Sequence, residues 1–570
     1  MRRRQRWVTS PEQPDLVQQL SQRHQVPELI ARILLNRGLA RSQEVASFLD
    51  PALGQLLPPA DMRDLPEAAD CLARALARRD PVAVYGDYDV DGLTATALLR
   101  HFLESLGARV VSYIPNRLTQ GYGLHPGAVT ELAKKAKVLV TVDCGISNAA
   151  EVALARKLGM AVIVTDHHEP PEELPPALAV VNPKRRDCGY AFKELAGVGV
   201  ALNLALGLRA CLRDQGWFVN RPEPDIRDYL DLVALGTAAD VAPLTGVNRI
   251  LVSRGLQVLG DNRRLGIQAL REVAGLPTGM MSLRDVVFRL APRLNAAGRL
   301  GHSRAALELL LTEDRDRARR LAQELNRLNQ ERQALGEAIL KAAVAQVQVE
   351  GLQDRPALVL AGEDWHPGII GIVAAKLVEL YHRPVALLSR VDGLGRGSAR
   401  SVEAFDLYAG LTACTEHLVQ YGGHPAAAGF TLDLADLAAF REAFEAVALA
   451  RLGREPQPPA LTVDAEITLP QLDGNFFFHL NRLRPFGQGN PPPVLACLQA
   501  RIIDSWVVGN NHLKLKLAQE GRVMTAIAFD QASLHPLRGS YDVAFNPRLN
   551  LYQNCNHPEL LVLDLGSAEV

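Results

Sequence analysis

The stretch Val82-Ala-Val-Tyr-Gly-Asp87-Tyr-Asp89-Val-Asp91-Gly92 joins a short apolar run to three carboxylates at alternate positions. The run from Val82 to Tyr85 has the length and the residue types of a buried strand. Three acids so close together repel one another unless a cation neutralises them, and hard oxygen ligands select magnesium, calcium or manganese. The segment therefore predicts a strand that ends at a site for a divalent cation.

An EF-hand calcium loop also opens with acids at alternate positions followed by glycine. In such a loop the twelfth residue is a glutamate that binds calcium through both oxygens, and a helix precedes the loop. Counted from Asp87, the twelfth residue here is Leu98, and a strand precedes the acids. We therefore exclude an EF-hand.

Two later apolar runs end in the same chemistry. Val138 to Val142 is followed by Asp143, and Ala161 to Thr165 by Asp166-His167-His168. Together with Val110 to Ile114, these runs alternate with amphipathic helices, a pattern that predicts a mostly parallel α/β sheet. Ligands of such sheets bind outside the carboxyl ends of the strands. We expect one cluster there, and Asp240, after a later Ala- and Leu-rich helix, adds a further acid. The expected members are Asp87, Asp89, Asp91, Asp143, Asp166, His167, His168 and Asp240.

A simpler interpretation is that each aspartate caps the helix that follows it. For Asp143 taken alone we would prefer that interpretation. Three acidic strand ends together with paired histidines favour a metal site instead. Mixed imidazole and carboxylate ligands with two nearby subsites suit two ions of manganese or magnesium.

The rest of the chain divides into further regions. At 570 residues it is too long for one core. We expect a second α/β domain, and a small β-barrel beyond a Pro-rich linker that starts at Arg454. A long polar helix from about Thr312 to Val349 would join the two α/β domains. The predicted parts are an N-terminal helical cap (1–60), a first α/β domain (61–260), a helical connector (261–350), a second α/β domain (351–453) and the barrel (454–570).

The composition excludes several classes of protein. Hydrophobic residues make up 48% and charged residues 22%, as in a globular protein, and the net charge of -1 does not by itself indicate nucleic acid. The basic start Met1-Arg-Arg-Arg is not followed by an apolar segment, and no run is long enough to cross a membrane. Seven scattered cysteines without a C-x-x-C pair fit a reducing cytoplasm.

Two motifs of nucleotide-binding proteins are missing. No G-x-x-x-x-G-K-[ST] sequence is present, so an ATP-driven motor is unsupported. Gly197-Val-Gly199 lacks the third small residue of a dinucleotide fingerprint, because Leu202 stands there, so we exclude a nicotinamide cofactor.

Asp166-His167-His168 is the motif that gives the DHH phosphoesterases their name, and Gly86 to Gly92 resembles their first motif. Stretches resembling the nucleases of this superfamily continue in order from about Ala75 to Phe430. The resemblance implies the metal ligands Asp89, Asp91, Asp143, His167 and Asp240, with Asp87, Asp166 and His168 close by. We expect Asp166 to orient a histidine ligand, because a carboxylate is a usual partner of a metal-bound imidazole. Some superfamily members carry a histidine where this chain has Tyr85.

The resemblance also implies a DHH-associated second domain and an OB-fold for the barrel. The segment Gly393-Leu-Gly-Arg-Gly-Ser398-Ala-Arg400-Ser401 is expected to combine exposed backbone amides, hydroxyls and arginines, which are the ingredients of a phosphate cradle. Taken alone, this segment would be interpreted as a glycine-rich hairpin with solvated arginines. Further expected substrate contacts are Arg117, Arg299 and His424, the last facing the metals from the second domain. Phe476 to Phe478, Trp506, Lys514 and Lys516 lie in the barrel region, where they either stack on bases or belong to the core.

The activity implied is a single-stranded-DNA-specific exonuclease that acts 5′ to 3′ in DNA repair and recombination and releases 5′-mononucleotides by two-metal hydrolysis. A single-strand-binding protein and a helicase are implied as partners. Two alternatives stay open: a small-substrate DHH phosphoesterase acting on oligoribonucleotides or cyclic dinucleotides, and an inactive DNA-binding relative.

Overall fold

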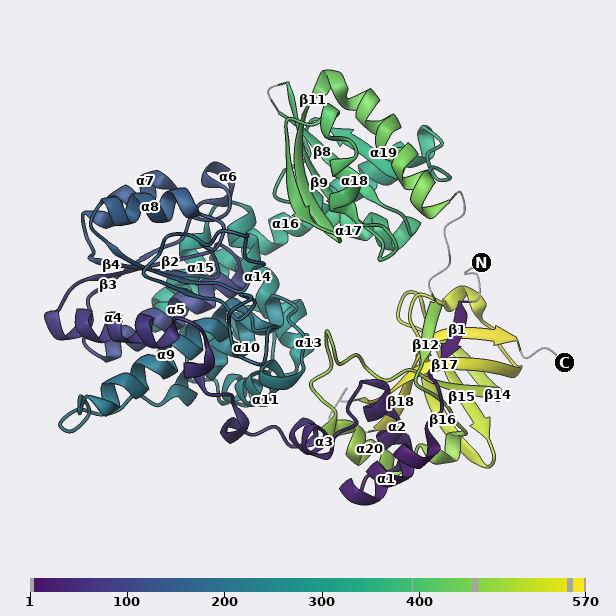
Figure 1. Cartoon of the computed structure of the whole chain (residues 1–570). Coiled ribbons are helices and arrows are strands. Elements are labelled where there is room, and N and C mark those ends of the chain that lie inside the picture. The colour runs from purple at the N-terminus through teal and green to yellow at the C-terminus, as the bar shows by residue number, and fades with distance from the viewer. Residues whose placement is uncertain (1–4, 392, 454–459, 551–556, 568–570) are drawn as a thin grey trace.

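A parallel sheet organises the first domain of the computed structural model, which describes residues 5–391, 393–453, 460–550 and 557–567 (Figure 1). Its strands run in the order β3-β2-β4-β5-β6, all parallel. Four of them were predicted, and the short β6 was not. The strands are β2 (Val82–Gly86), β3 (Val110–Tyr113), β4 (Val138–Val142), β5 (Ala161–Thr165) and β6 (Ala179–Val181).

Helices cover both faces of this sheet. One face packs on α7 (Pro126–Ala133) and α8 (Ala149–Lys157) through Tyr85, Leu139 and Val162. The other face, with Val84 and Val140, packs on the larger core. That core includes α4 (Leu65–Arg78), α5 (Val90–Ser105), α9 (Gly197–Asp214), α10 (Leu230–Ala239), α11 (Gly246–Asp261), α12 (Leu265–Val273), α14 (Ala291–Arg299) and α15 (Ser303–Leu311).

The connector predicted at residues 261–350 is not a separate part. Its helices belong to the core of the first domain as far as Leu328, because their apolar faces, with Leu270, Leu294 and Leu310, are buried there. The long helix is α16 (Arg315–Val349), with Asp314 as N-cap. Only its last turns, with Ile339 and Val347, pack against the second domain.

The second domain is a five-stranded mixed sheet of order β10-β11-β9-β8-β7. It contains β7 (Leu358–Gly362), α17 (Ile370–Tyr381), β8 (Val385–Val391), β9 (Leu394–Arg400), α18 (Leu407–Thr412), β10 (Gln420–His424), β11 (Ala427–Asp433) and α19 (Leu437–Leu452). The glycine-rich segment is β9, an inner strand paired with both β8 and β11. Our expectation of exposed backbone amides there was wrong, since the two neighbouring strands pair with them.

The C-terminal strands close into the predicted barrel. The order β14-β15-β16-β18-β17 is completed by pairing of β17 with β14. These strands are β14 (Leu495–Val508), β15 (His512–Gln519), β16 (Arg522–Ala528), β17 (Gly539–Asn550) and β18 (His557–Ser567). Residues 454–459 of the predicted linker lie outside the described residues.

The N-terminal helices cover the barrel. These helices are α1 (Pro14–His24), α2 (Glu28–Asn36) and α3 (Ser42–Leu49), and Ile30, Ile33 and Phe48 share one core with the barrel and with α20 (Gly474–Arg482). In addition, β1 (Arg6–Thr9) pairs with β12 (Ala460–Val463). We call residues 6–49, 460–550 and 557–567 the barrel unit.

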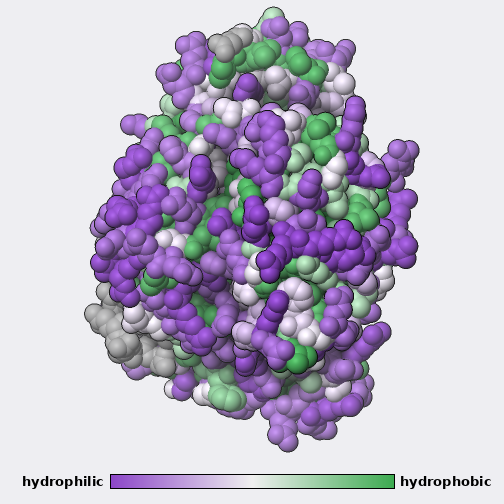
Figure 2. Space-filling model, turned by 90° about the vertical axis from the view of Figure 1, so that its left-hand side faces the viewer, coloured by the Kyte–Doolittle hydropathy of each residue, from purple (hydrophilic) through white to green (hydrophobic). Residues whose placement is uncertain are grey.

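The face of the molecule seen in Figure 2 is covered mostly by hydrophilic side chains, with apolar ones in scattered patches. Within the described ranges, no helix is long and apolar enough to cross a membrane. The six cysteines described, all except Cys555, are free thiols.

The three consecutive phenylalanines lie on α20 and differ in exposure. Phe476 and Phe477 are buried, whereas Phe478 is 64% exposed. We therefore predict that Phe476→Ala lowers the free energy of unfolding of the barrel unit by about 3–5 kcal/mol, because it leaves a cavity. Phe478→Ala, the control, should change it by less than about 0.5 kcal/mol. Chemical denaturation of both variants measures this, and equal losses would contradict the assignment.

Candidate active site

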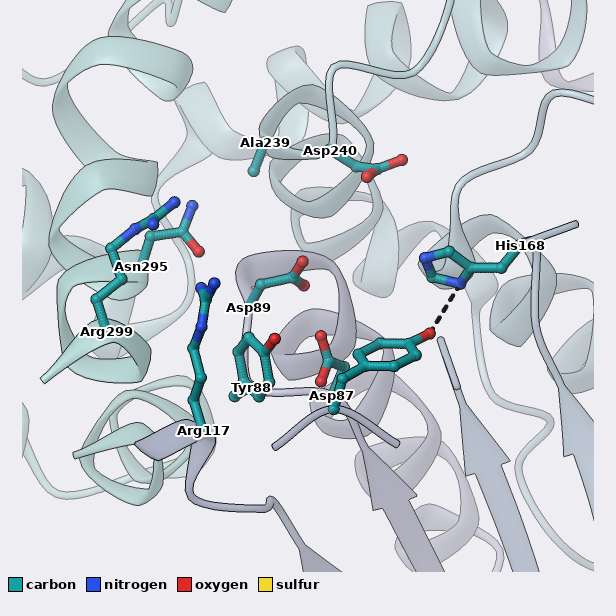
Figure 3. Close-up of a pocket in the computed structure, with 10 residues that line it drawn as sticks. Asp87, Tyr88, Asp89, Arg117, His168, Ala239, Asp240, Asn295 and Arg299 are labelled. Carbon is teal, nitrogen blue, oxygen red and sulfur yellow. Dashed lines mark hydrogen bonds between the residues drawn. The ribbon is translucent and has the colours of Figure 1, made fainter. Parts of the chain in front are cut away.

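The acidic cluster lies at the carboxyl edge of the first sheet, as expected (Figure 3). Asp87 follows β2, Asp143 follows β4, and His167 and His168 follow β5. Asp240 is the C-cap of α10. The parallel register aligns the ends of these strands, and α10 brings its own end to the same place.

Asp89 is a helix cap and also faces the cluster. Its Oδ1 accepts hydrogen bonds from the amides of Asp91 (3.0 Å) and Gly92 (3.1 Å) at the start of α5. The capping interpretation is therefore correct for Asp89 and uses only one of its oxygens. The carboxylate also lines the pocket, so the two roles are compatible.

Asp91 is fully buried and held by the backbone of another helix. Its Oδ2 accepts from the amide of Gly197 (2.6 Å) and its Oδ1 from that of Val198 (2.9 Å), at the start of α9. Any side chain at position 197 would collide with Asp143, since a Cβ there would lie 2.6 Å from Asp143 Oδ1. Glycine is therefore required where α9 meets the two carboxylates.

Asp143 gives the strongest indication of a cation site. It is 2% exposed, has a left-handed backbone (φ 61°), and its Oδ1 receives no hydrogen bond. This oxygen lies 3.1 Å from Nε2 of His167. The Oδ1 of Asp87 is likewise buried without a partner. Unpaired buried oxygens facing an imidazole nitrogen are costly unless a cation binds between them.

Three overlapping groups of ligand atoms are close enough to hold an ion. They are Asp87, Asp89 and Asp143; Asp91, His167 and Asp240; and Asp143, His167 and His168. Oxygen-rich ligands with one or two imidazoles suit Mn²⁺ or Mg²⁺ better than softer metals. The donor set therefore fits two hard divalent cations, and Asp143 and His167 are shared between groups.

Asp166 supports the histidines instead of binding a cation directly. Its Oδ1 accepts from the amides of His167 and His168 and lies 2.7 Å from Nδ1 of His168, while its Oδ2 accepts from the amide of Ile146. Both oxygens are thus occupied. We expected Asp166 to orient a histidine ligand, and the ring that it orients is His168.

The pKa values follow from burial and crowding. Burial, and then the charge of neighbouring carboxylates, raises the pKa of Asp91 and of Asp240 to about 7. Asp87 and Asp143 also have raised pKa values for these two reasons. Burial lowers the pKa of His167, which favours the neutral imidazole that binds metals. Burial opposes ionisation of Asp166, but the hydrogen bond and charge of His168 outweigh it and lower that pKa.

A pocket of about 300 Å³ opens beside the cluster. Acids form one side of it, and Arg117 and Arg299 form the other (Figure 3). Arg117 lies over the ring of Tyr88, 5.0 Å from its centre. Burial and the charges of Arg117, Arg332 and Arg400 lower the pKa of Arg299 to about 10. The pocket thus has two guanidinium groups in its wall, Arg117 and Arg299, and the charges of Arg332 and Arg400 act on Arg299 as well.

The second domain contributes to this arginine group. Nη1 of Arg400 is 3.3 Å from Oγ of Ser398, and Nη1 of Arg299 donates to the carbonyl of Gly368 (3.2 Å). A Cβ at Gly371, at the start of α17, would lie 2.8 Å from Ser398 Oγ and 3.1 Å from Arg400 Nη2. Both side chains thus approach the amino-terminal end of α17, where anions are favoured.

His424 does not join the pocket. It lies exposed at the end of β10, an edge strand separated from β9 by β11. The expectation that it faces the metals is not supported, because β9 and α17, not β10, carry the groups nearest to the arginines.

Three polar pocket residues were missed from the sequence: Tyr88, Tyr122 and Asn295. Tyr122 Oη lies 3.1 Å from His168 Nδ1, and Asn295 Oδ1 accepts from the amide of Val90. Each of these three residues lies inside or beside a motif, but tyrosine and asparagine do not by themselves indicate a metal site. Tyr85 supports this region: its hydroxyl donates to the carbonyl of Gly123 and accepts from the amide of His125, which fixes the Tyr122 loop.

Comparison with known families agrees with this architecture. The DHH family N-terminal domain matches residues 81–237, the DHHA1 domain matches residues 344–449, and the RecJ OB domain matches residues 463–564. The fold and the acid and histidine cluster thus define a phosphoesterase of the DHH class.

Individual relatives identify the family within this class. The chain is 39% identical to the RecJ exonuclease of Dickeya dadantii over 89% of this chain and 90% of the relative. It is 35% identical to that of Bacillus subtilis over 99% of this chain and 71% of the relative. A crystal structure of RecJ from Thermus thermophilus in complex with Mn²⁺ superposes with a TM-score of 0.85 at 35% identity, covering 100% of this chain and 81% of that one. The chain belongs to the RecJ family.

The raised pKa values of Asp91 and Asp240 predict how pH and metal act together. In the unfolded chain these carboxyls ionise near pH 4. Without metal they therefore contribute stability below pH 4 that is lost as the pH rises through about 7. Mn²⁺ binds the ionised carboxylates, so we predict that it raises Tm more at pH 8 than at pH 5.

Thermal unfolding with Mn²⁺ or with a chelator, at both pH values, measures this. The Asp91→Asn variant is the control and should show a smaller difference between the two pH values. An equal Mn²⁺ effect at pH 5 and pH 8 in the unsubstituted protein would contradict the account.

Proposed function

We propose that the chain is a metal-dependent exonuclease specific for single-stranded DNA that acts from a 5′ end and releases mononucleotides. The observation that carries this proposal is the pocket with acids on one side and arginines on the other. Its volume of about 300 Å³ is at the small end of ligand sites. A scissile phosphate at the acids and a terminal phosphate at the arginines would hold one nucleotide between them.

The proposed ligands are Asp89, Asp91, Asp143, His167 and Asp240, with Asp87 and His168 within the same groups. RecJ from Thermus thermophilus has been crystallised with Mn²⁺ and with Mg²⁺, and the ligands here suit either ion. Two such ions supply an activated water and stabilise the attacking and leaving oxygens. The protein keeps its carboxylates in place through the amides of α5 and α9, so little reorganisation is needed.

The arginine group explains how a strand end would be recognised. Arginine binds phosphate through two parallel hydrogen bonds, and a terminal phosphate carries more negative charge than an internal one. Arg117 and Arg299 come from the first domain, and Ser398 and Arg400 come from the second. Recognition of the end would therefore require both domains on opposite sides of the strand.

The alternatives fit the molecule less well. A phosphoesterase for oligoribonucleotides or cyclic dinucleotides needs neither the barrel nor the N-terminal helices that share its core. An inactive DNA-binding relative is disfavoured because every acid of the cluster is present. Buried carboxylates without partners would be an unexplained cost in a protein without catalytic metal.

The barrel supplies a surface for the rest of the strand. Lys514 and Trp506 are directly paired across β14 and β15, and Lys516 Nζ lies 5.9 Å from the centre of the Trp506 ring. Cations beside an aromatic ring suit phosphates and bases of single strands. A single-strand-binding protein and a helicase stay predictions from family resemblance. A cytoplasmic location stays a prediction from the scattered cysteines, of which the six described are free thiols.

The main test is degradation of end-labelled DNA with Mn²⁺. We predict that single strands are degraded much faster than blunt duplex, that 5′-mononucleotides appear, and that digestion starts from the 5′ end. In Asp91→Ala, activity should fall by more than the roughly 10- to 100-fold that loss of an outer-shell partner costs. Equal rates on duplex and single strands, or substantial activity in a folded Asp91→Ala protein, would contradict the proposal.

Arg400→Ala tests end recognition separately. Loss of charge-assisted hydrogen bonds, each contributing about 1.5–3 kcal/mol, should raise KM for 5′-phosphorylated strands roughly 10- to 100-fold. The preference over 5′-hydroxyl strands should shrink. Arg396→Ala is a matched control, because this exposed arginine lies on the same strand and the same side of β9. If Arg400→Ala keeps the full preference, the arginine group does not recognise the end.

A further inference from the structure

A buried arginine joins the first domain to the barrel unit. Arg249 on α11 is 1% exposed, and no carboxylate forms an ion pair with it in the described part of the chain. Its Nε donates to the carbonyl of Phe48 (2.9 Å), and its guanidinium carbon Cζ lies over the Phe48 ring, 3.7 Å from the ring centre. Phe48 belongs to α3 of the barrel unit, on the other side of the contact.

The remaining nitrogens of Arg249 bind the end of α20. Nη1 donates to the carbonyl of Leu483 (3.0 Å), and Nη2 donates to those of Arg482 (3.0 Å) and Arg484 (2.8 Å). Carbonyls at a helix C-terminus lack partners within the helix and carry partial negative charge. One guanidinium thus satisfies the ends of two helices, and all four carbonyls belong to the barrel unit.

The surrounding contacts extend this junction. The amide of Leu244 donates to the carbonyl of Gln488 (2.7 Å), and Asn490 Nδ2 donates to the carbonyls of Leu483 (2.8 Å) and Pro485 (2.7 Å). A Cβ at Gly487 would lie 2.7 Å from Leu244, so backbone and side chain are in close contact. We call residues 243–249, Phe48 and 482–490 the seam.

The seam also lies next to the metal cluster in sequence. Only Val241 and Ala242 separate Asp240 from Pro243, the first residue of the seam. Along the chain, the first domain is followed by α16, then by the second domain and then by the barrel (Figure 1). Through the seam, the barrel contacts the first domain again. The barrel is therefore held against the domain that carries the acids by contacts centred on Arg249.

The chemistry of Arg249 means that its hydrogen bonds to the barrel unit are kept or lost together. Burial, with the charge of Arg37 nearby, lowers the pKa of Arg249 to about 9, yet arginine keeps its proton in proteins. A buried cation without a carboxylate depends on its four carbonyl partners, and separating the barrel unit would remove all of them. Partial separation is therefore unfavourable, and the two bodies stay in one orientation.

We propose that Arg249 is a positioning residue, which fixes the barrel unit on the first domain so that a strand bound by the barrel is directed to the metal cluster. The role of Arg249 in directing DNA rests on the proposed nuclease function. Its role in docking the barrel unit rests on the seam contacts alone. It assigns no contact between Arg249 and DNA. Short strands that reach only the pocket should not depend on Arg249, whereas long strands should.

The test compares Arg249→Met with Arg271→Met in the full chain. Arg271 is the matched control, since it is 2% exposed and also donates to carbonyls, those of Leu259, Pro277 and Gly279, but all within the first domain. Arg249→Lys, which keeps the charge and loses the planar fork, is measured as a milder variant in case Arg249→Met does not fold.

Two readouts are used. Small-angle X-ray scattering, which needs no activity, should show a larger maximum dimension for Arg249→Met and unchanged scattering for Arg271→Met. The substrates, with Mn²⁺, are single strands of about 6 nucleotides, near the lower end of the site size of one OB-fold, and of about 40 nucleotides, well beyond that site size. KM of Arg249→Met should rise about tenfold only for the long strand, because the barrel no longer holds it near the pocket. Arg249→Lys should lie between this variant and the unsubstituted protein.

Unchanged scattering in folded Arg249→Met and Arg249→Lys would overturn the docking role. Expanded scattering with an unchanged KM for long strands would overturn the positioning role. If the unsubstituted protein does not degrade single strands at all, the proposed function fails, and scattering alone then decides whether Arg249 docks the barrel unit.

Discussion

The rest of the structure has to accommodate one constraint, the repulsion among buried carboxylates at one edge of a parallel sheet. Asp87, Asp91 and Asp143 are each at most 4% exposed, and two of them keep an oxygen without a hydrogen bond. Such groups are tolerated where a cation completes the site. The strand register, the glycine at 197 and the left-handed backbone of Asp143 all serve to hold these groups in contact.

Much of the first domain was predictable from local sequence. Buried parallel strands read as short apolar runs, so β2, β4 and β5 were found, and the rule that ligands gather at the carboxyl ends brought Asp87, Asp143 and His167 together. Asp240 was found because it follows a helix rich in Ala and Leu, and the family resemblance implied it as a ligand. These successes depend on signals that lie within a few residues of each other.

The failures involve contacts between distant segments. Nothing local shows that Ile33 packs with the barrel hundreds of residues later, or that Arg249 binds the carbonyls after α20. The glycine-rich segment was expected to expose its amides, but glycine also occurs in inner strands where a neighbouring ring comes close, as Phe430 does to Gly397. Tyr122 was missed because a tyrosine between two glycines reads as an ordinary turn.

The central claim is that this cluster holds two divalent cations, and manganese anomalous scattering from crystals grown with Mn²⁺ tests it most directly. The account predicts two peaks within the cluster, one among Asp87, Asp89 and Asp143 and the other among Asp91, His167 and Asp240. Crystals that bind Mn²⁺ only elsewhere, or that show a peak in neither or only one of these two groups, would contradict it.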